Sequence, residues 1–191
     1  MKLSHALRLS RGDVLALTGG GGKTTAMFRL AGETAATGWR VLTTTSTRIF
    51  AAQIKRSPAH VVFDPARQTL AELWPRLEAA LAEHGQVLLI GQSDPASGKA
   101  FGLPPETLDA LAAAGRFDLI INEADGSRMR SFKAPAAHEP VIPACTTLVT
   151  PVVGLDVLGK PLQEDFIHRA ELVGHLSGTS PGAPVTIETV A

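Results

Sequence analysis

The sequence of 191 residues lacks several features that define common classes of protein. It has one cysteine, Cys145, which can form neither an intrachain disulfide nor a zinc site built from cysteines, and this is typical of a reducing compartment. It has no apolar run near the roughly 18–20 residues that span a bilayer. Residues 1–11 contain no apolar stretch of signal-peptide length. We therefore expect a cytoplasmic protein with no membrane partner.

Net charge is also missing. Lys and Arg number 18, Asp and Glu number 18, and the formal charge is zero. Nucleic-acid binding normally requires a basic face that displaces counterions, so we expect no nucleic-acid partner. Apolar residues are abundant, because they make up 45% of the chain, which is enough for the core of one domain. We expect residues 1–191 to form a single domain, with 178–191, rich in Gly, Ser and Pro, as a tail.

Short apolar runs alternate with helical patterns along the chain, which is typical of repeated β–α units and a mostly parallel sheet. The polar segment 91–102 is expected to be a surface loop, and 127–143 a long ordered loop. Helices are expected over 27–35, over 70–81 with a kink or restart at Pro75, and over 105–111. The predicted strands are 14–18, 40–44, 61–63, 87–90, 117–122 and 147–150.

The first predicted strand leads directly into a glycine-rich turn, Gly19-Gly20-Gly21-Gly22-Lys23-Thr24-Thr25, and a helix follows. This turn matches the end of the pattern G-x-x-x-x-G-K-[ST], in which backbone amides hold phosphates, the lysine reaches the terminal phosphates and the hydroxyl holds Mg²⁺. The first glycine of the pattern is replaced by Leu17. A flexible glycine linker is the alternative, but four consecutive glycines would be entropically costly there.

The glycine-rich turn therefore predicts that residues 19–25 bind the phosphates of a nucleotide. Lys23 is the expected catalytic lysine and Thr24 an expected metal ligand. The fold class predicted by this motif and the strand pattern is a three-layer α/β/α domain of the P-loop NTPase type.

Two carboxylates, Glu123 and Asp125, follow a predicted apolar strand. Ligands of parallel α/β sheets bind at the carboxyl ends of the strands, and residues two apart in an extended chain face the same side. We expect both carboxylates to be Mg²⁺ ligands with catalytic roles. The alternative is an acidic, solvated strand end.

Several basic residues follow the acidic pair: Arg128, Arg130 and Lys133, with His138 a few residues later. They could hold a second anionic substrate, or they could belong to a solvated loop, and the sequence leaves both readings open. Thr44 and Arg48 come after the second predicted strand, which in such folds lies near the phosphates. They are candidates for the same second-substrate site.

Four strings, GGGGKTT, VLTTTSTRI, NEADGSRMRSFKAPAAHEPVIP and PVVGLDVLGKPL, occur in this order. From about residue 15 to 168 the chain thus resembles the YqeC family of selenium cofactor biosynthesis proteins, accessory proteins of selenium-dependent molybdenum hydroxylases. The resemblance implies a P-loop protein that uses ATP or GTP with Mg²⁺ and helps to mature a molybdenum hydroxylase or its cofactor. The positions that carry over are Gly19 to Thr25, Thr44, Arg48, Glu123, Asp125, Gly126, Ser127, Lys133, His138, Glu139, Asp156 and His168.

Members of this family commonly continue into a strand with an Asn-Lys-x-Asp-like sequence, of the type that recognises guanine. The 191 residues end before such a strand, so we expect a C-terminal truncation relative to the family, and the choice between ATP and GTP stays open. Three functions remain. They are an NTP-hydrolysing maturation factor, a small-molecule kinase or ligase that uses ATP, and a nucleotide-binding scaffold without turnover.

Overall fold

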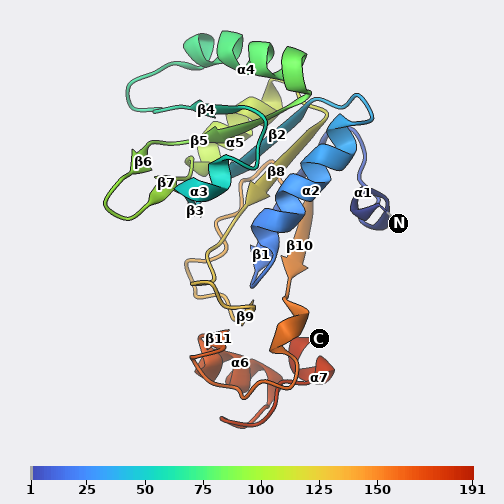
Figure 1. The fold of residues 1–191 in the computed structure, drawn as a ribbon, viewed down its shortest axis with the longest axis vertical. Coiled ribbons are helices and arrows are strands. Elements are labelled where there is room, and N and C mark those ends of the chain that lie inside the picture. The colour runs from blue at the N-terminus through green and yellow to red at the C-terminus, as the bar shows by residue number, and fades with distance from the viewer. Residues whose placement is uncertain (1) are drawn as a thin grey trace.

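The computed structural model describes residues 2–191 and has at its centre a six-stranded sheet (Figure 1). The strand order is β10-β1-β8-β2-β5-β4, and all neighbouring strands are parallel. The expected α/β class is therefore confirmed, as is the parallel sheet with its six predicted strands. The strands are β1 Asp13–Gly19, β2 Val41–Thr45, β4 His60–Val62, β5 Gln86–Ile90, β8 Leu119–Glu123 and β10 Leu148–Val152.

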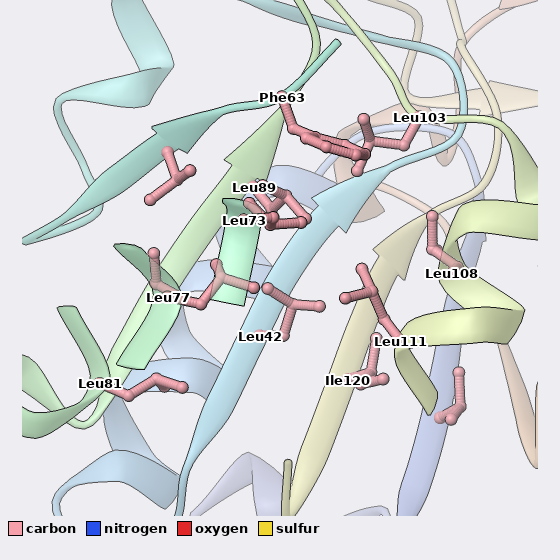
Figure 2. Close-up of a cluster of buried hydrophobic side chains, with 13 residues drawn as sticks. Leu42, Phe63, Leu73, Leu77, Leu81, Leu89, Leu103, Leu108, Leu111 and Ile120 are labelled. Atoms are coloured by element: carbon pink, nitrogen blue, oxygen red, sulfur yellow. The ribbon is translucent and has the colours of Figure 1, made fainter. Parts of the chain in front are cut away.

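Helices cover both faces of this sheet because side chains alternate between the faces along each strand. On one face, Leu73 and Leu77 of α4 and Leu111 of α5 pack with Leu42 and Ile120 of the strands (Figure 2). On the other face, α1 and α2 pack against the alternate side chains of the same strands. The helix through Pro75 is one continuous element with no restart. The helices are α1 Leu3–Ala6, α2 Lys23–Ala35, α4 Leu70–His84 and α5 Pro105–Ala113.

The segment 91–102 is not simply the expected surface loop. It forms a hairpin of β6 (Ser93–Asp94) and β7 (Lys99–Phe101), and β7 pairs antiparallel with β3 (Arg48–Phe50). These strands have two or three residues each, which is too few for an alternating pattern to be recognised in the sequence. The short helix α3 (Ala51–Ile54) follows β3 directly.

The C-terminal part of the chain lies beyond the carboxyl end of β10 and builds a third hydrophobic cluster (Figure 1). Most residues of the tail 178–191 are exposed, and the segment is docked at Val185, which is 2% exposed. Its N–H donates to Lys160 O (2.8 Å) and its carbonyl accepts from Gly159 N (2.9 Å). Thr189 is also buried and Val190 packs against the third cluster, so the tail is held at a few positions. The elements here are β9 Phe132–Lys133, η1 Leu155–Val157, β11 Ile167–His168, α6 Ala170–Ser177 and α7 Ile187–Val190.

Within residues 2–191, no helix has the length and apolar character needed to cross a membrane.

Candidate functional site

The glycine-rich turn connects the carboxyl end of β1 to the N-terminus of α2. Gly19 (φ 95°) and Gly22 (φ 101°) adopt the left-handed backbone conformation that favours glycine. Gly22 is the N-cap of α2, and the first helical hydrogen bond runs from Ala26 N to Gly22 O (2.8 Å). The amides before Ala26 have no partner within the helix, as at any helix start, so this 13-residue helix presents free donors and the positive end of its dipole.

The rest of the turn is held by the protein itself. Gly19 N donates to Asp125 Oδ2 (2.9 Å), Gly20 N to Val152 O (2.7 Å) and Gly21 N to Ser131 O (3.1 Å). A Cβ atom on Gly20 would lie 2.2 Å from the carbonyl oxygen of Ser131, so the close approach of these two segments requires glycine.

Lys23 begins α2 and folds back over the turn. Its Nζ donates to Gly19 O (2.6 Å) and Gly20 O (3.1 Å) and lies 3.2 Å from Asp125 Oδ1. The side chain is 3% exposed. A buried ammonium needs a compensating partner, and Asp125 supplies one.

The two carboxylates at the end of β8, Glu123 as its last residue and Asp125 just beyond it, lie in different surroundings. Glu123 sits beside β1, and its Oε2 accepts a hydrogen bond from Thr24 Oγ1 (2.7 Å). Burial raises the pKa of Glu123, although the Thr24 hydroxyl and the charge of Lys23 lower it. Asp125, in contrast, is 1% exposed. Its carboxylate accepts a hydrogen bond from Gly19 N and forms ion pairs with Lys23 and Lys133.

A chain of ion pairs, buried at Asp125 and Lys133 and partly buried at Glu139 and Arg169, runs from the glycine-rich turn into the C-terminal part of the molecule. Lys133 Nζ lies 3.2 Å from Asp125 Oδ2 and also donates to Glu139 Oε2 and Gly126 O. Glu139 Oε2 accepts a further bond from Arg169 Nη1 (2.8 Å), and Arg169 is the N-cap of α6. Burial alone would raise the pKa of Glu139, but Arg169 and Lys133 lower it to about 2.

A pocket of about 400 Å³ opens over the glycine-rich turn. It brings the Thr24–Glu123 pair and Lys23 together with basic side chains from three other segments. Its lining is Gly20 to Thr24, Arg48, Phe50, Gln53, Lys99, Glu123 and Gly126 to Met129.

The expected second-substrate residues divide into two groups. Arg48 and Arg128 line the pocket. The others do not line it. Arg130 donates to Glu164 O (3.0 Å), and the side chain of Lys133 is 1% exposed and held in ion pairs. The side chain of His138 is 78% exposed. Thr44 is fully buried in β2.

Other predicted residues have supporting positions. The Thr25 hydroxyl accepts a bond from Arg56 (3.2 Å) and does not line the pocket. Asp156 accepts a bond from the Ser131 hydroxyl (2.9 Å), next to the backbone that holds Gly21. His168 is buried, and burial together with the charge of Arg169 lowers its pKa.

The sequence reasoning missed Phe50, Gln53, Lys99 and Met129 of the pocket lining. Lys99 is separated from the glycine-rich turn by more than seventy residues and reaches the pocket only through the hairpin. No motif in the sequence indicates this. In the part of the chain that the structure describes, no cluster of three or more His, Cys, Asp or Glu side chains could hold a metal ion.

The fold and the turn together define an α/β protein with a parallel sheet and a glycine-rich loop at the carboxyl ends of its strands. The sequence model of the family described as "YqeC protein" matches residues 15–171, and the chain belongs to this family, as expected from its motifs. It is 35% identical over 179 residues to the Escherichia coli (strain K12) protein named "Uncharacterized protein YqeC". That alignment covers 93% of this chain and 65% of the relative, so the chain spans less than two thirds of the relative's length.

Proposed function

We propose that the protein is a P-loop protein that binds a nucleoside triphosphate, ATP or GTP, with Mg²⁺ at Gly19–Thr25. The observation that carries this proposal is the convergence of three groups in one pocket. These are the N-terminus of α2 at Gly22, the ammonium of Lys23, and the Thr24–Glu123 pair. Free amides, a lysine and a helix dipole are the features that bind phosphate anions.

Each group has a distinct part in this proposal. The amides from Gly22 onward hold phosphate oxygens, and Lys23 exchanges its carbonyl partners for the terminal phosphates. Thr24 and Glu123 supply oxygen ligands for Mg²⁺, which prefers oxygen and commonly uses one or two carboxylates together with phosphates and waters. The ion would neutralise charge that builds up on the phosphates.

Asp125 has a different role from the one its spacing suggests. Its carboxylate is already committed to Gly19 N, Lys23 and Lys133. We therefore assign Asp125 to holding the turn and its lysine in place, and Glu123 to the metal.

The cellular role that we propose is an NTP-hydrolysing accessory function in the maturation of a selenium-dependent molybdenum hydroxylase or its cofactor, in the cytoplasm. This role rests on the motifs of the family and not on the geometry of the site. A small-molecule kinase or ligase is the second candidate, and one observation favours it: Arg48, Lys99 and Arg128 add three positive charges to the pocket.

Calorimetry with ATP and GTP, with and without Mg²⁺, tests the binding site. Lys23→Ala should weaken binding of the preferred nucleotide roughly 10-fold or more, because a charged hydrogen bond is lost. Glu123→Gln should retain binding without Mg²⁺ and lose the gain that Mg²⁺ gives to the parent protein. Lys55→Ala, at an exposed lysine that does not line the pocket, is the control.

Melting temperatures establish that each variant is folded, and Thr24→Val replaces Lys23→Ala if that variant is not. Parent-like affinity in folded Lys23→Ala and Thr24→Val proteins would overturn the site. Phosphate release with and without candidate acceptors then separates hydrolysis, transfer and binding without turnover.

A further inference from the structure

The small antiparallel sheet of β3, β7 and β6 lies at one side of the main sheet (Figure 1). Side chains of β3 and β7 form one wall of the pocket. Arg48 of β3 pairs with Phe101 of β7, and Phe50 pairs with Lys99. Because side chains alternate along a strand, these four side chains share one face of the sheet. Ile49, on the opposite face, is 2% exposed and belongs to the core.

Each cation of this wall lies over an aromatic ring. The guanidinium carbon of Arg48 is 4.8 Å from the centre of the Phe101 ring, and Lys99 Nζ is 5.1 Å from the centre of the Phe50 ring. Phe50 is 40% exposed and Phe101 is 39% exposed. The wall thus offers flat apolar surface and positive charge side by side.

The positive charges in the pocket lining outnumber its negative ones, although Asp94, which lies opposite Lys99 in the hairpin, interacts electrostatically with Arg48. Lys23 is paired with Asp125. Among residues 2–191, Arg48, Lys99 and Arg128 have no carboxylate within 4.0 Å, and Glu123 is the one carboxylate in the pocket lining. Three cations gathered from β3, β7 and the segment after β8 attract an anion more strongly than scattered surface charges do.

The backbone near Arg128 supports a binding role. Arg128 (φ 49°) and Met129 (φ 63°) are consecutive non-glycine residues in the left-handed conformation, and both line the pocket. This conformation is disfavoured for side chains other than glycine, and such residues gather at functional sites.

We propose that the Arg48–Lys99 wall, together with Arg128, binds a second substrate: a planar ring that carries a phosphate or carboxylate group. The proposal deepens the proposed function, because it places this substrate in the same pocket as the nucleotide. The ring lies against Phe50, and the anionic group lies among the three cations.

Phenyl phosphate and benzoate are suitable probes, with inorganic phosphate and benzyl alcohol as comparisons that lack the ring or the charge. Each is titrated, by NMR chemical shifts, into the free protein and into protein saturated with a non-hydrolysable ATP analogue and Mg²⁺. The parent protein should bind one or both ring acids, and benzyl alcohol far more weakly. Which of the two binds identifies the anionic group.

In protein saturated with the ATP analogue, the double variant Arg48→Gln/Lys99→Gln should weaken ring-acid binding roughly 10-fold or more. Phe50→Leu should weaken phenyl phosphate but not inorganic phosphate, and Lys55→Gln should change neither. Parent-like binding by the double variant, or no ring-acid binding by the parent protein at millimolar concentration, would overturn the proposal.

The Lys23→Ala variant separates this proposal from the proposed function. It should bind the nucleotide roughly 10-fold more weakly or worse and still bind the ring acid. If the parent protein binds the ring acid but no nucleotide, the proposed function is contradicted and the second-substrate proposal is supported. If it binds nucleotide but no ring acid, only the second-substrate proposal is contradicted.

Discussion

Glu139 connects three parts of the chain through a single carboxylate oxygen. It accepts hydrogen bonds from Lys133, which is paired with Asp125 beneath the glycine-rich turn, and from Arg169 at the start of α6. Its side chain is 16% exposed, so these charges interact with little screening by water. Removing one member of such a buried network leaves the others without compensation.

We expect Glu139→Gln to lower the free energy of unfolding at pH 7 by roughly 1–3 kcal/mol, because two cations of a partly solvated network lose their partner. The pKa of Glu139 falls from 4.5 to about 2 on folding. A lowered pKa contributes stability that is present above the unfolded value and is lost as the pH falls through the folded value. The difference between parent and variant should therefore shrink from about pH 4.5 down to about pH 2. Urea unfolding at several pH values measures this.

Glu83→Gln is the control for this measurement, because the side chain of Glu83 is 77% exposed. A parent–variant difference for Glu139 that stays constant between pH 7 and pH 3 would contradict the assignment.

At the scale of elements, the glycine-rich turn depends on close packing against the segment around Ser131. We expect Gly20→Ala to destabilise the fold by about 2 kcal/mol or more, because its Cβ would overlap the Ser131 carbonyl oxygen at 2.2 Å. Gly32→Ala in α2, where an added Cβ meets nothing within 4 Å, should stabilise the protein by about 0.5–1 kcal/mol. Denaturant unfolding of both variants gives the comparison, and equal effects would show that the turn is loosely packed.

The elements also show what the sequence can predict. Continuous apolar runs such as Val87 to Ile90 identify buried parallel strands, because both faces of such strands are covered. The hairpin that carries Lys99 has no such run, so its contribution to the pocket was not predictable.

Within the site, the glycine-rich turn is recognised because its chemistry is local in sequence. The basic residues after β8 are not so easily sorted. Arg128 lines the pocket, whereas Lys133, only five residues later, is buried with Asp125 and Glu139. Backbone turns at Arg128 and Met129 decide this difference, and no spacing rule encodes them.

At the scale of the whole molecule, the C-terminal part has its own hydrophobic cluster beside the main sheet. We expect Val185→Ala to lower the free energy of unfolding by roughly 1–3 kcal/mol, because a buried side chain is replaced by a cavity. Ile187→Ala, in the same segment but 70% exposed, should change stability by roughly 0.5 kcal/mol or less. Denaturant unfolding distinguishes the two, and hydrogen exchange of the Val185 amide should be slow. If both substitutions change the free energy of unfolding by the same small amount, residues 178–191 form a loosely attached tail.

The hydrogen bonds from Gly19, Gly20 and Gly21 to Asp125, Val152 and Ser131 have a kinetic consequence. Fixing the backbone of one residue costs roughly 1–2 kcal/mol of conformational entropy. In this turn the backbone is already fixed when the chain folds, so a ligand does not have to order it. A ligand that enters the pocket meets a turn that is already ordered. We therefore expect association to require only the movement of the Lys23 side chain from its carbonyl partners, and no closing of a mobile loop.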